Sequence, residues 1–193
     1  MKLLPCGDSA VLLDCASLDE ARKWHDALAD SYESVLGARS VLVHGSPPEL
    51  RRIVSQTTPR SAPTFDDRLV RIPVRYDGPD LADVAEHTGL DTAAIIEAHT
   101  GGEWEVAFAG FAPGFAYLSG GDSRLTVPRR ARPRQRIDGG SVGLAGGFTA
   151  VYPRESPGGW QIIGHTETTM FDAERDPPAL LQPGMRVRFE DVS

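Results

Sequence analysis

The feature that most constrains the fold is the second half of the chain, where from Trp104 onward short apolar runs alternate with glycine and proline. The helical spacing of apolar residues disappears there, and each run has the length of one strand of a hairpin. Many such strands must pair their edges, so they favour a barrel or a sandwich. The expected strands are 106–108, 141–144, 149–152, 160–163 and 185–189, the last after the turn Gln182-Pro183-Gly184.

The first half reads instead as helices and strands in alternation. The capping box Ser17-Leu18-Asp19-Glu20 is followed by apolar residues at helical spacing, which predicts a helix over 17–31. Pro47-Pro48 opens a second short helix through Ser55, since proline suits a first helical turn. Short β-rich apolar runs predict strands before and after the first helix, at 10–13 and 39–44.

A stretch with two prolines and no apolar period, residues 57–64, has the composition of a connector, so we place a subdomain boundary near it. Beyond it, a strand is expected over 69–76, with Pro73 indicating an edge or a bulge. Two small helices are expected over 79–87 and 91–99. The predicted class is α+β, with a small α+β domain over residues 1–78 and a β-barrel domain over residues 79–193.

The charge and the cysteine content exclude several classes of protein. A formal net charge of −7 argues against a nucleic-acid binder, which usually presents a net basic surface. No stretch has the apolar core of a signal peptide or the length of a membrane span, so a cytoplasmic protein without membrane contact is expected. Two cysteines and five histidines without ligand spacing indicate neither a disulfide scaffold nor a metal site.

The densest charge is the segment 129–136, with five arginines in eight residues in a chain of 20 basic and 27 acidic residues. Guanidinium groups bind carboxylate and phosphate bidentately, so an anion site is one interpretation. A solvated strand with arginines paired to surface acids is the other. In an extended segment, alternate side chains project to one side, and these are Arg130, Arg132, Arg134 and Arg136.

Glycine is concentrated at 110–114 and 139–147, where backbone amides could approach a ligand or simply form tight turns. Gly146 and Gly147 are therefore candidates for the anion site. No P-loop occurs, and the only lysines are Lys2 and Lys23. Ser141 lies in a formal GxSxG pattern, but no helix pattern follows, so it is rejected as a nucleophile. His165, after an apolar strand, is the candidate acid or base, with a hydrogen-bonded structural histidine as the alternative.

Several motifs, taken in order, resemble one known family. They are Pro5-Cys6-Gly7-Asp8-Ser9-Ala10, Gly110-Phe111-Ala112-Pro113-Gly114-Phe115-Ala116-Tyr117-Leu118, Val127-Pro128-Arg129-Arg130-Ala131-Arg132-Pro133-Arg134, Gly140-Ser141-Val142-Gly143-Leu144-Ala145-Gly146-Gly147 and Ser156-Pro157-Gly158-Gly159-Trp160. The chain thus resembles the family of 5-oxoprolinase B subunits (PxpB), also called the allophanate hydrolase subunit 1 or sporulation-kinase-inhibitor (KipI) family. The resemblance implies a cyclophilin-like barrel and, as partners, the C and A subunits of 5-oxoprolinase. It also implies ATP-dependent opening of 5-oxoproline to glutamate, with ATP shared with the partners and Mg expected to accompany it.

The sequence departs from the family pattern around the expected site. Phe148 stands where glutamine is usual, His165 where arginine is usual, Glu167 where proline is usual, and 137–139 where a Val-Pro-Ala-like run is usual. We expect Phe115, Tyr117, Phe148 and His165 to line one mouth of the barrel, where small-molecule sites in barrels occur. These side chains, with Arg130, Arg132 and Arg134, form the predicted substrate site. Two alternatives stay open: a regulator that binds a sensor histidine kinase, and a subunit of an allophanate or urea hydrolase.

Overall fold

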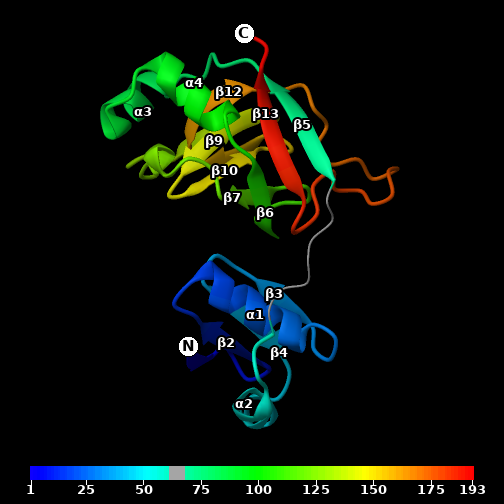
Figure 1. Ribbon diagram of the computed structural model, residues 1–193. Helices are drawn as coiled ribbons and strands as arrows, with labels where there is room; N and C mark the ends of the chain where they lie inside the picture. The colour runs from blue at the N-terminus through cyan, green and yellow to red at the C-terminus, as the bar shows by residue number, and fades with distance from the viewer. Residues whose placement is uncertain (61–67) are drawn as a thin grey trace. The chain divides into compact units, whose positions relative to one another are not determined.

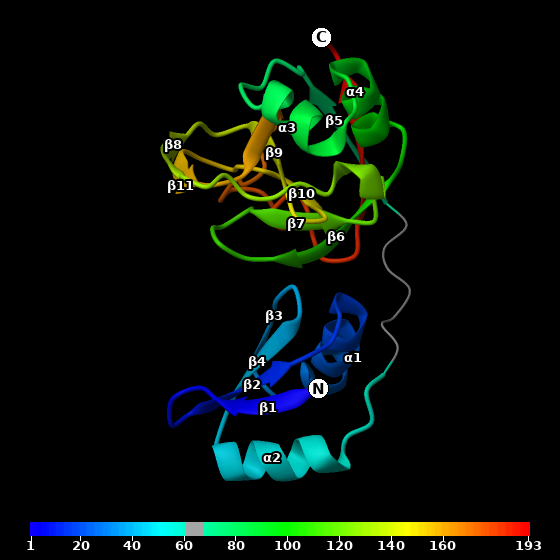
Figure 2. The same ribbon diagram turned by 90° about the vertical axis from the view of Figure 1, so that its left-hand side faces the viewer.

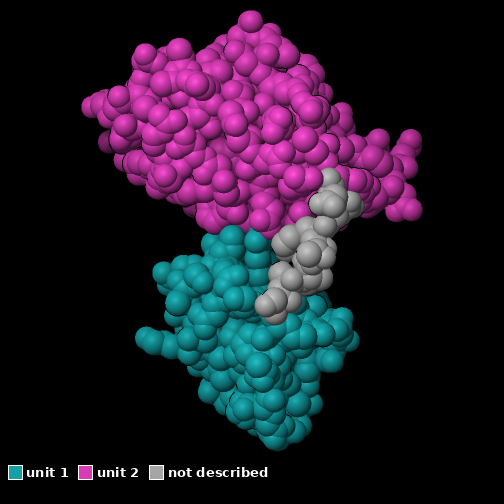
Figure 3. Space-filling model, viewed as in Figure 1, with its two compact units in different colours: residues 1–65 teal, residues 66–193 magenta. Residues whose placement is uncertain are grey.

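The computed structural model describes residues 1–60 and 68–193, and the chain divides into two compact units, residues 1–65 and 66–193 (Figure 3). The predicted connector 57–64 therefore lies partly outside the described residues. The division falls before β5 (Leu69–Val74), which the sequence assigns to the first domain of residues 1–78. The reason is pairing, because β5 lies parallel to β13 (Arg186–Asp191) along its whole length.

The first unit is a four-stranded antiparallel sheet with two helices (Figure 1). The sheet order is β1-β2-β4-β3, and apolar side chains from both helices complete its core, among them Trp24, Leu28, Leu50 and Val54. The elements are β1 (Lys2–Pro5), β2 (Ala10–Asp14), α1 (Leu18–Leu28), β3 (Ser34–Leu36), β4 (Ser40–His44) and α2 (Pro47–Gln56).

The predicted start of α1 is confirmed. Ser17 accepts a hydrogen bond from the backbone N–H of Glu20 at 3.1 Å, and the Glu20 carboxylate accepts one from the N–H of Ala16 at 2.6 Å. These contacts satisfy donors that a helix start leaves free. The helix ends at Leu28, three residues before the predicted end at Ser31.

The second unit is built on a seven-stranded sheet with the order β12-β9-β10-β7-β6-β13-β5. All neighbours are antiparallel except β5 and β13. The remaining elements of this unit are α3 (Leu81–Thr88), α4 (Thr92–Thr100), β6 (Trp104–Ala109), β7 (Ala116–Ser119), the 3-10 turn η1 (Ser123–Leu125), β8 (Arg134–Ile137), β9 (Ser141–Ala145), β10 (Phe148–Val151), β11 (Ser156–Gly158) and β12 (Gln161–His165).

The two edges of this sheet approach each other. Arg75, just after β5, and His165, at the end of β12, exchange two backbone hydrogen bonds of 2.9 Å. The sheet is therefore nearly closed, which removes most of its free edge. The prediction of a mixed helix and strand protein with a barrel-like sheet is confirmed, and Pro73 lies on an edge strand as expected.

Helices α3 and α4 lie on the outside of the sheet, with α3 against β12 and α4 against β13 (Figures 1 and 2). Apolar side chains of both helices, including Val84 and Ile95, join the main core of the unit. A separate two-stranded ribbon, β8 with β11, carries part of the arginine segment (Figure 2). The strands β7, β8 and β11 were not predicted.

Candidate functional site

The centre of the arginine region is a buried acid that the sequence analysis did not single out. Asp80 is 1% exposed and lies at the start of α3. Its backbone N–H donates to the carbonyl of Ile162 at 3.0 Å, and its carboxylate accepts from the N–H of Ile162 at 2.7 Å. Asp80 therefore joins the start of α3 to β12.

Two arginines meet on this carboxylate. Arg134 donates to both carboxylate oxygens of Asp80, each at 2.7 Å, and Arg130 donates to one of them at 2.5 Å. The hydrogen bonds from Arg134 to Asp80 raise the pKa of that guanidinium above its usual value. A buried carboxylate with several charge-assisted donors is rigid, so Asp80 fixes the segment that carries Arg130 and Arg134 against α3 and β12.

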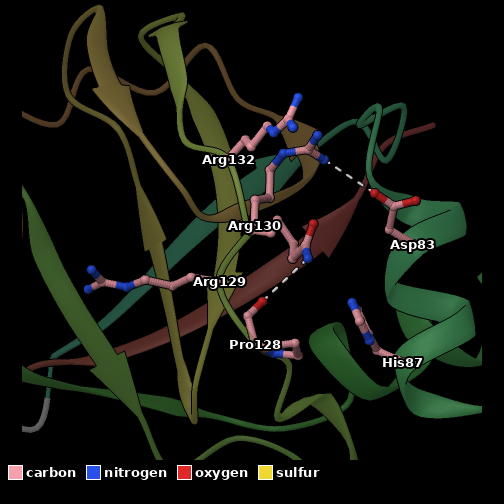
Figure 4. Close-up of a pocket in the computed structure, with 8 residues that line it drawn as sticks. Asp83, His87, Pro128, Arg129, Arg130 and Arg132 are labelled. Carbon is pink, nitrogen blue, oxygen red and sulfur yellow. Dashed lines mark hydrogen bonds and ion pairs between the residues drawn. The ribbon is translucent and has the colours of Figure 1, made fainter.

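Arg132 lies outside this cluster and lines a pocket of about 560 Å³ (Figure 4). Its side chain is exposed, and no ion pair or hydrogen bond of it occurs within residues 1–60 and 68–193. The pocket is bounded by α3 on one side and by the arginine segment on the other. Its lining residues are Asp83, His87, Pro128, Arg129, Arg130, Ala131, Arg132 and Gln161.

The arginines thus do not project to one side as an extended segment would place them. Only 134–137 form a strand, and Arg136 pairs with Asp138 and Glu155 at 3.0 Å each, in solvent. Figure 4 shows the guanidinium groups of Arg130 and Arg132 on one side of the pocket and that of Arg129 pointing away from them. Of the three predicted anion-binding arginines, Arg132 is the one that keeps its charge available.

Three of the predicted rim residues come together in an aromatic cluster. Phe115 lies 5.0 Å from Tyr117 between ring centroids, and Tyr117 lies 6.0 Å from Phe148. Tyr152 also packs on Phe115. Burial raises the pKa of Tyr152 to about 12, while the nearby charge of Arg129 acts in the opposite direction. The charge of Arg129 thus acts on the aromatic cluster, as that of Arg134 also does.

His165 is not part of that cluster. Across β9, His165 pairs with Ser141, whereas Phe148 pairs with Ala145, so the two residues lie at opposite ends of one strand. The His165 ring is hydrogen-bonded to the Glu167 carboxylate at 3.1 Å. The structure therefore does not bring His165 to the other predicted site residues.

The double glycine forms the turn between β9 and β10. Gly146 has φ +58°, which glycine adopts without strain. Its N–H donates to the carbonyl of Val127 at 2.7 Å, and the N–H of Val127 returns a bond of 3.3 Å. The amide of Gly146 thus holds the start of the arginine segment, and Gly147 is exposed beside it.

The described part of the chain holds neither a cluster of metal-ligating side chains nor a membrane-spanning helix. Among residues 1–60 and 68–193, no group of three or more acidic, histidine or cysteine side chains is arranged to hold a metal ion. Within the same residues, none of the helices has the length and hydropathy needed to cross a membrane.

Comparison with known proteins gives consistent results. The family described as carboxyltransferase domain, subdomain C and D, matches residues 1–181. The 5-oxoprolinase B subunit of Escherichia coli O157:H7 is 50% identical over 127 residues, which cover 64% of this chain and 58% of that protein. The 5-oxoprolinase B subunit of Haemophilus influenzae is 36% identical over 206 residues, which cover 98% of this chain and 97% of that protein. The match thus spans little more than half of the first relative and nearly all of the second.

Solved structures agree on the fold. The Pyrococcus horikoshii protein PH0987 is 32% identical with a TM-score of 0.63, over 100% of this chain and 98% of that one. TTHA0988 is 30% identical with a TM-score of 0.77, over 95% of this chain but 40% of that one. The Kluyveromyces lactis urea carboxylase shares the fold at 16% identity, with a TM-score of 0.73 over 99% of this chain and 22% of that one.

Proposed function

The chain belongs to the family of carboxyltransferase domains, subdomain C and D, in which its relatives are B subunits of 5-oxoprolinase. We propose that it is the B subunit of an ATP-dependent 5-oxoprolinase. In this role it helps to open 5-oxo-L-proline to L-glutamate, and it acts together with the C and A subunits. The names of the relatives do not favour a kinase regulator or a urea-pathway hydrolase. A cyclophilin-like class for the barrel and a cytoplasmic location remain predictions.

The observation that carries this proposal is the available cation in the pocket. 5-Oxoproline is a small carboxylate, and Arg132 supplies a guanidinium without an ion-pair partner among the described residues. Asp80 holds the neighbouring Arg130 and Arg134, so the wall that carries Arg132 is fixed before a ligand arrives. Preorganised charge is more effective than mobile charge in binding and catalysis.

The residues of this chain do not by themselves fit a complete ATP site. The only lysines, Lys2 and Lys23, belong to the first unit, and no P-loop is present. The described residues hold no cluster of acids for a Mg ion. Opening an unactivated lactam requires activation of its carbonyl, and ATP supplies this by phosphoryl transfer when it is bound. We therefore assign the remaining phosphate and metal contacts to the partner subunits.

The test is phosphate release and glutamate formation with 5-oxoproline, for the chain alone, with the C subunit, and with both the C and A subunits. We expect no substrate-dependent hydrolysis by the chain alone and turnover only in the full mixture. Strong hydrolysis by the isolated chain would contradict the shared site. Absence of activity in every mixture would contradict the proposed enzyme and leave the kinase-regulator hypothesis.

A further inference from the structure

Two buried polar atoms on the wall of the arginine pocket have no hydrogen-bond partner within the described part of the chain. They are Nε of Arg130, an obligatory donor, and Oε1 of Gln161, an acceptor. Unsatisfied buried groups are costly, and native structures contain few of them. An unpaired donor and an unpaired acceptor on the same pocket wall are therefore candidates for hydrogen bonds to a ligand.

The surroundings explain why these two atoms are the ones left open. The Nη1 group of Arg130 is occupied by Asp80, at 2.5 Å, and by Asp83, at 3.2 Å, whereas no described residue accepts from Nε. Gln161 is 3% exposed, and its Nε2 donates to the carbonyl of Pro128 at 3.3 Å. This bond fixes the orientation of the amide and leaves Oε1 as its open end.

We propose that Arg130 Nε and Gln161 Oε1 recognise the amide edge of a lactam. In a small lactam ring the C=O and the N–H point to the same side, as the two oxygens of a carboxylic acid do. The lactam carbonyl accepts from Arg130 Nε–H, and the lactam N–H donates to Gln161 Oε1. The choice of ring rests on the function proposed above, and Arg132 binds the carboxylate of the same molecule.

This arrangement makes Gln161 a specificity-determining residue. A lactone of the same shape has a ring oxygen in place of the N–H, so its lone pairs face the Gln161 oxygen. The ring-opened product, glutamate, has no N–H at this edge, so a carboxylate oxygen accepts from Arg130 Nε–H but Gln161 Oε1 is left facing an acceptor. The wall therefore favours the substrate over its product and over an ester analogue.

Access to this edge passes Arg130, whose side chain is 28% exposed. Its bond to Asp83 lies at the surface, where the Asp83 side chain is 54% exposed, whereas its bond to Asp80 is buried. Exposed ion pairs are weak. The ligand thus enters by displacing the Arg130–Asp83 contact while the Asp80 contact holds the guanidinium in place.

The test is a binding titration of the full-length 15N-labelled chain, alone and with the C subunit, against 5-oxo-L-proline and its lactone analogue, 5-oxotetrahydrofuran-2-carboxylate. The readout is the dissociation constant together with the side-chain amide signals of Gln161. We expect the lactam to shift these signals and to bind about tenfold more tightly than the lactone, the effect of one paired against one unpaired hydrogen bond. Equal affinities, or no binding of either ring, would overturn the proposal.

Variants sharpen the result. Gln161→Met should reduce the lactam-to-lactone ratio to about one, whereas Gln135→Met, which removes an exposed amide from the arginine segment, should keep the ratio of the unmodified chain. A Gln161→Met chain that keeps the full ratio would overturn the proposal. If this variant does not fold, the dissociation constants of the lactam and the lactone for the unmodified chain still test the proposal.

The proposed enzyme activity and the proposed lactam site can be contradicted independently of each other. Turnover of 5-oxoproline by the complex with equal lactam and lactone affinities leaves the enzyme and removes the role of Gln161. A clear lactam preference without turnover in any mixture supports the lactam site and removes the enzyme.

Discussion

Two buried polar centres of the second unit, Asp80 and His99, differ in what surrounds them. Asp80 is a carboxylate that accepts from two arginines and from the backbone of Ile162. His99 is fully buried, stacks on Phe189 with ring centroids 4.3 Å apart, and has its pKa lowered to about 3 by burial. One centre is charged and borders a pocket, and the other is neutral and enclosed.

The hydrogen bonds of His99 define a closed network. Thr149 donates its hydroxyl proton to the carbonyl of Gly143 at 3.1 Å, so it accepts from His99 Nε2–H at 2.9 Å. The Nδ1 atom then accepts from the Tyr76 hydroxyl at 2.7 Å. Every polar atom of the ring is used inside the core. The network joins α4 to the sheet and leaves nothing for a ligand.

The Asp80 centre is different because two cations share one acid. Arg130 also contacts the exposed Asp83, and Arg132 lines the pocket beside them without an ion-pair partner among the described residues. Replacing a buried charge cluster by apolar residues can be neutral for stability, so such clusters are weak evidence for stability alone. In this unit, the buried charge next to the pocket positions functional groups, whereas the buried neutral network serves packing.

The largest expected effect follows from Asp80→Asn, which leaves Arg130 and Arg134 without their carboxylate. Removing one partner of a buried ion pair costs about 3–5 kcal/mol, and we expect a loss of this size in the free energy of unfolding. Denaturant titration measures it. Asp83→Asn is the matched control, since its side chain is 54% exposed and its loss should cost under about 1 kcal/mol. Equal small losses in both variants would show that the buried Asp80 ion pairs stabilise the fold no more than the exposed Asp83 contact does.

A smaller effect, over the range from pH 7 to pH 5, is expected for His99 and appears as pH dependence. Its pKa is about 3 in the fold, against an ordinary value of 6.5, so below pH 6.5 the unfolded chain binds a proton that the folded chain does not. The stability contributed by neutral His99 is complete above pH 6.5. As the pH falls toward 3, the free energy of unfolding decreases by up to about 1.4 kcal/mol per unit.

Urea titrations between pH 7 and pH 5 measure this slope. His99→Gln should show a shallower slope than the unmodified chain, because the proton-binding site of the unfolded state is gone. His87→Gln, at an exposed histidine, is the matched control and should leave the slope unchanged. A His99→Gln slope as steep as that of the unmodified chain would show that the His99 network does not exclude the proton.

Local signals in the sequence predicted most of the elements. Capping residues and proline positions placed α1 and α2 within a few residues, and apolar runs placed β2, β4, β9, β10, β12 and β13. The sequence did not predict β1, β3, β7, β8 or β11, which are short and whose residues are partly polar or rich in glycine and proline. The assignment of β5 depended on a parallel partner more than a hundred residues away, which no local pattern reveals.

The candidate site was predicted only in part. The clustering of arginines pointed to the segment that borders the pocket, but period-two alternation could not show that Arg130 and Arg134 turn to Asp80. Asp80 lies between Pro79 and Leu81 and belongs to no motif, so its role is visible only from its contacts in the folded structure. Gln161 gave no signal for the same reason. His165 was expected beside Phe115, Tyr117 and Phe148 because their strand ends were assigned to one mouth of the barrel. The sequence does not reveal the register of β12 on β9, which places His165 at the other end.

The most direct test compares Arg132→Gln with Arg134→Gln in the reconstituted complex, by KM for 5-oxoproline and by Tm of the chain. Arg132 is exposed and without an ion-pair partner in the described residues, so Arg132→Gln should leave Tm nearly unchanged and raise KM by about tenfold or more. Arg134 holds Asp80, so Arg134→Gln should lower Tm clearly. An unchanged KM for Arg132→Gln, with an unchanged Tm for Arg134→Gln, would contradict the assignment of Arg132 to the ligand and of Arg134 to the wall of the pocket.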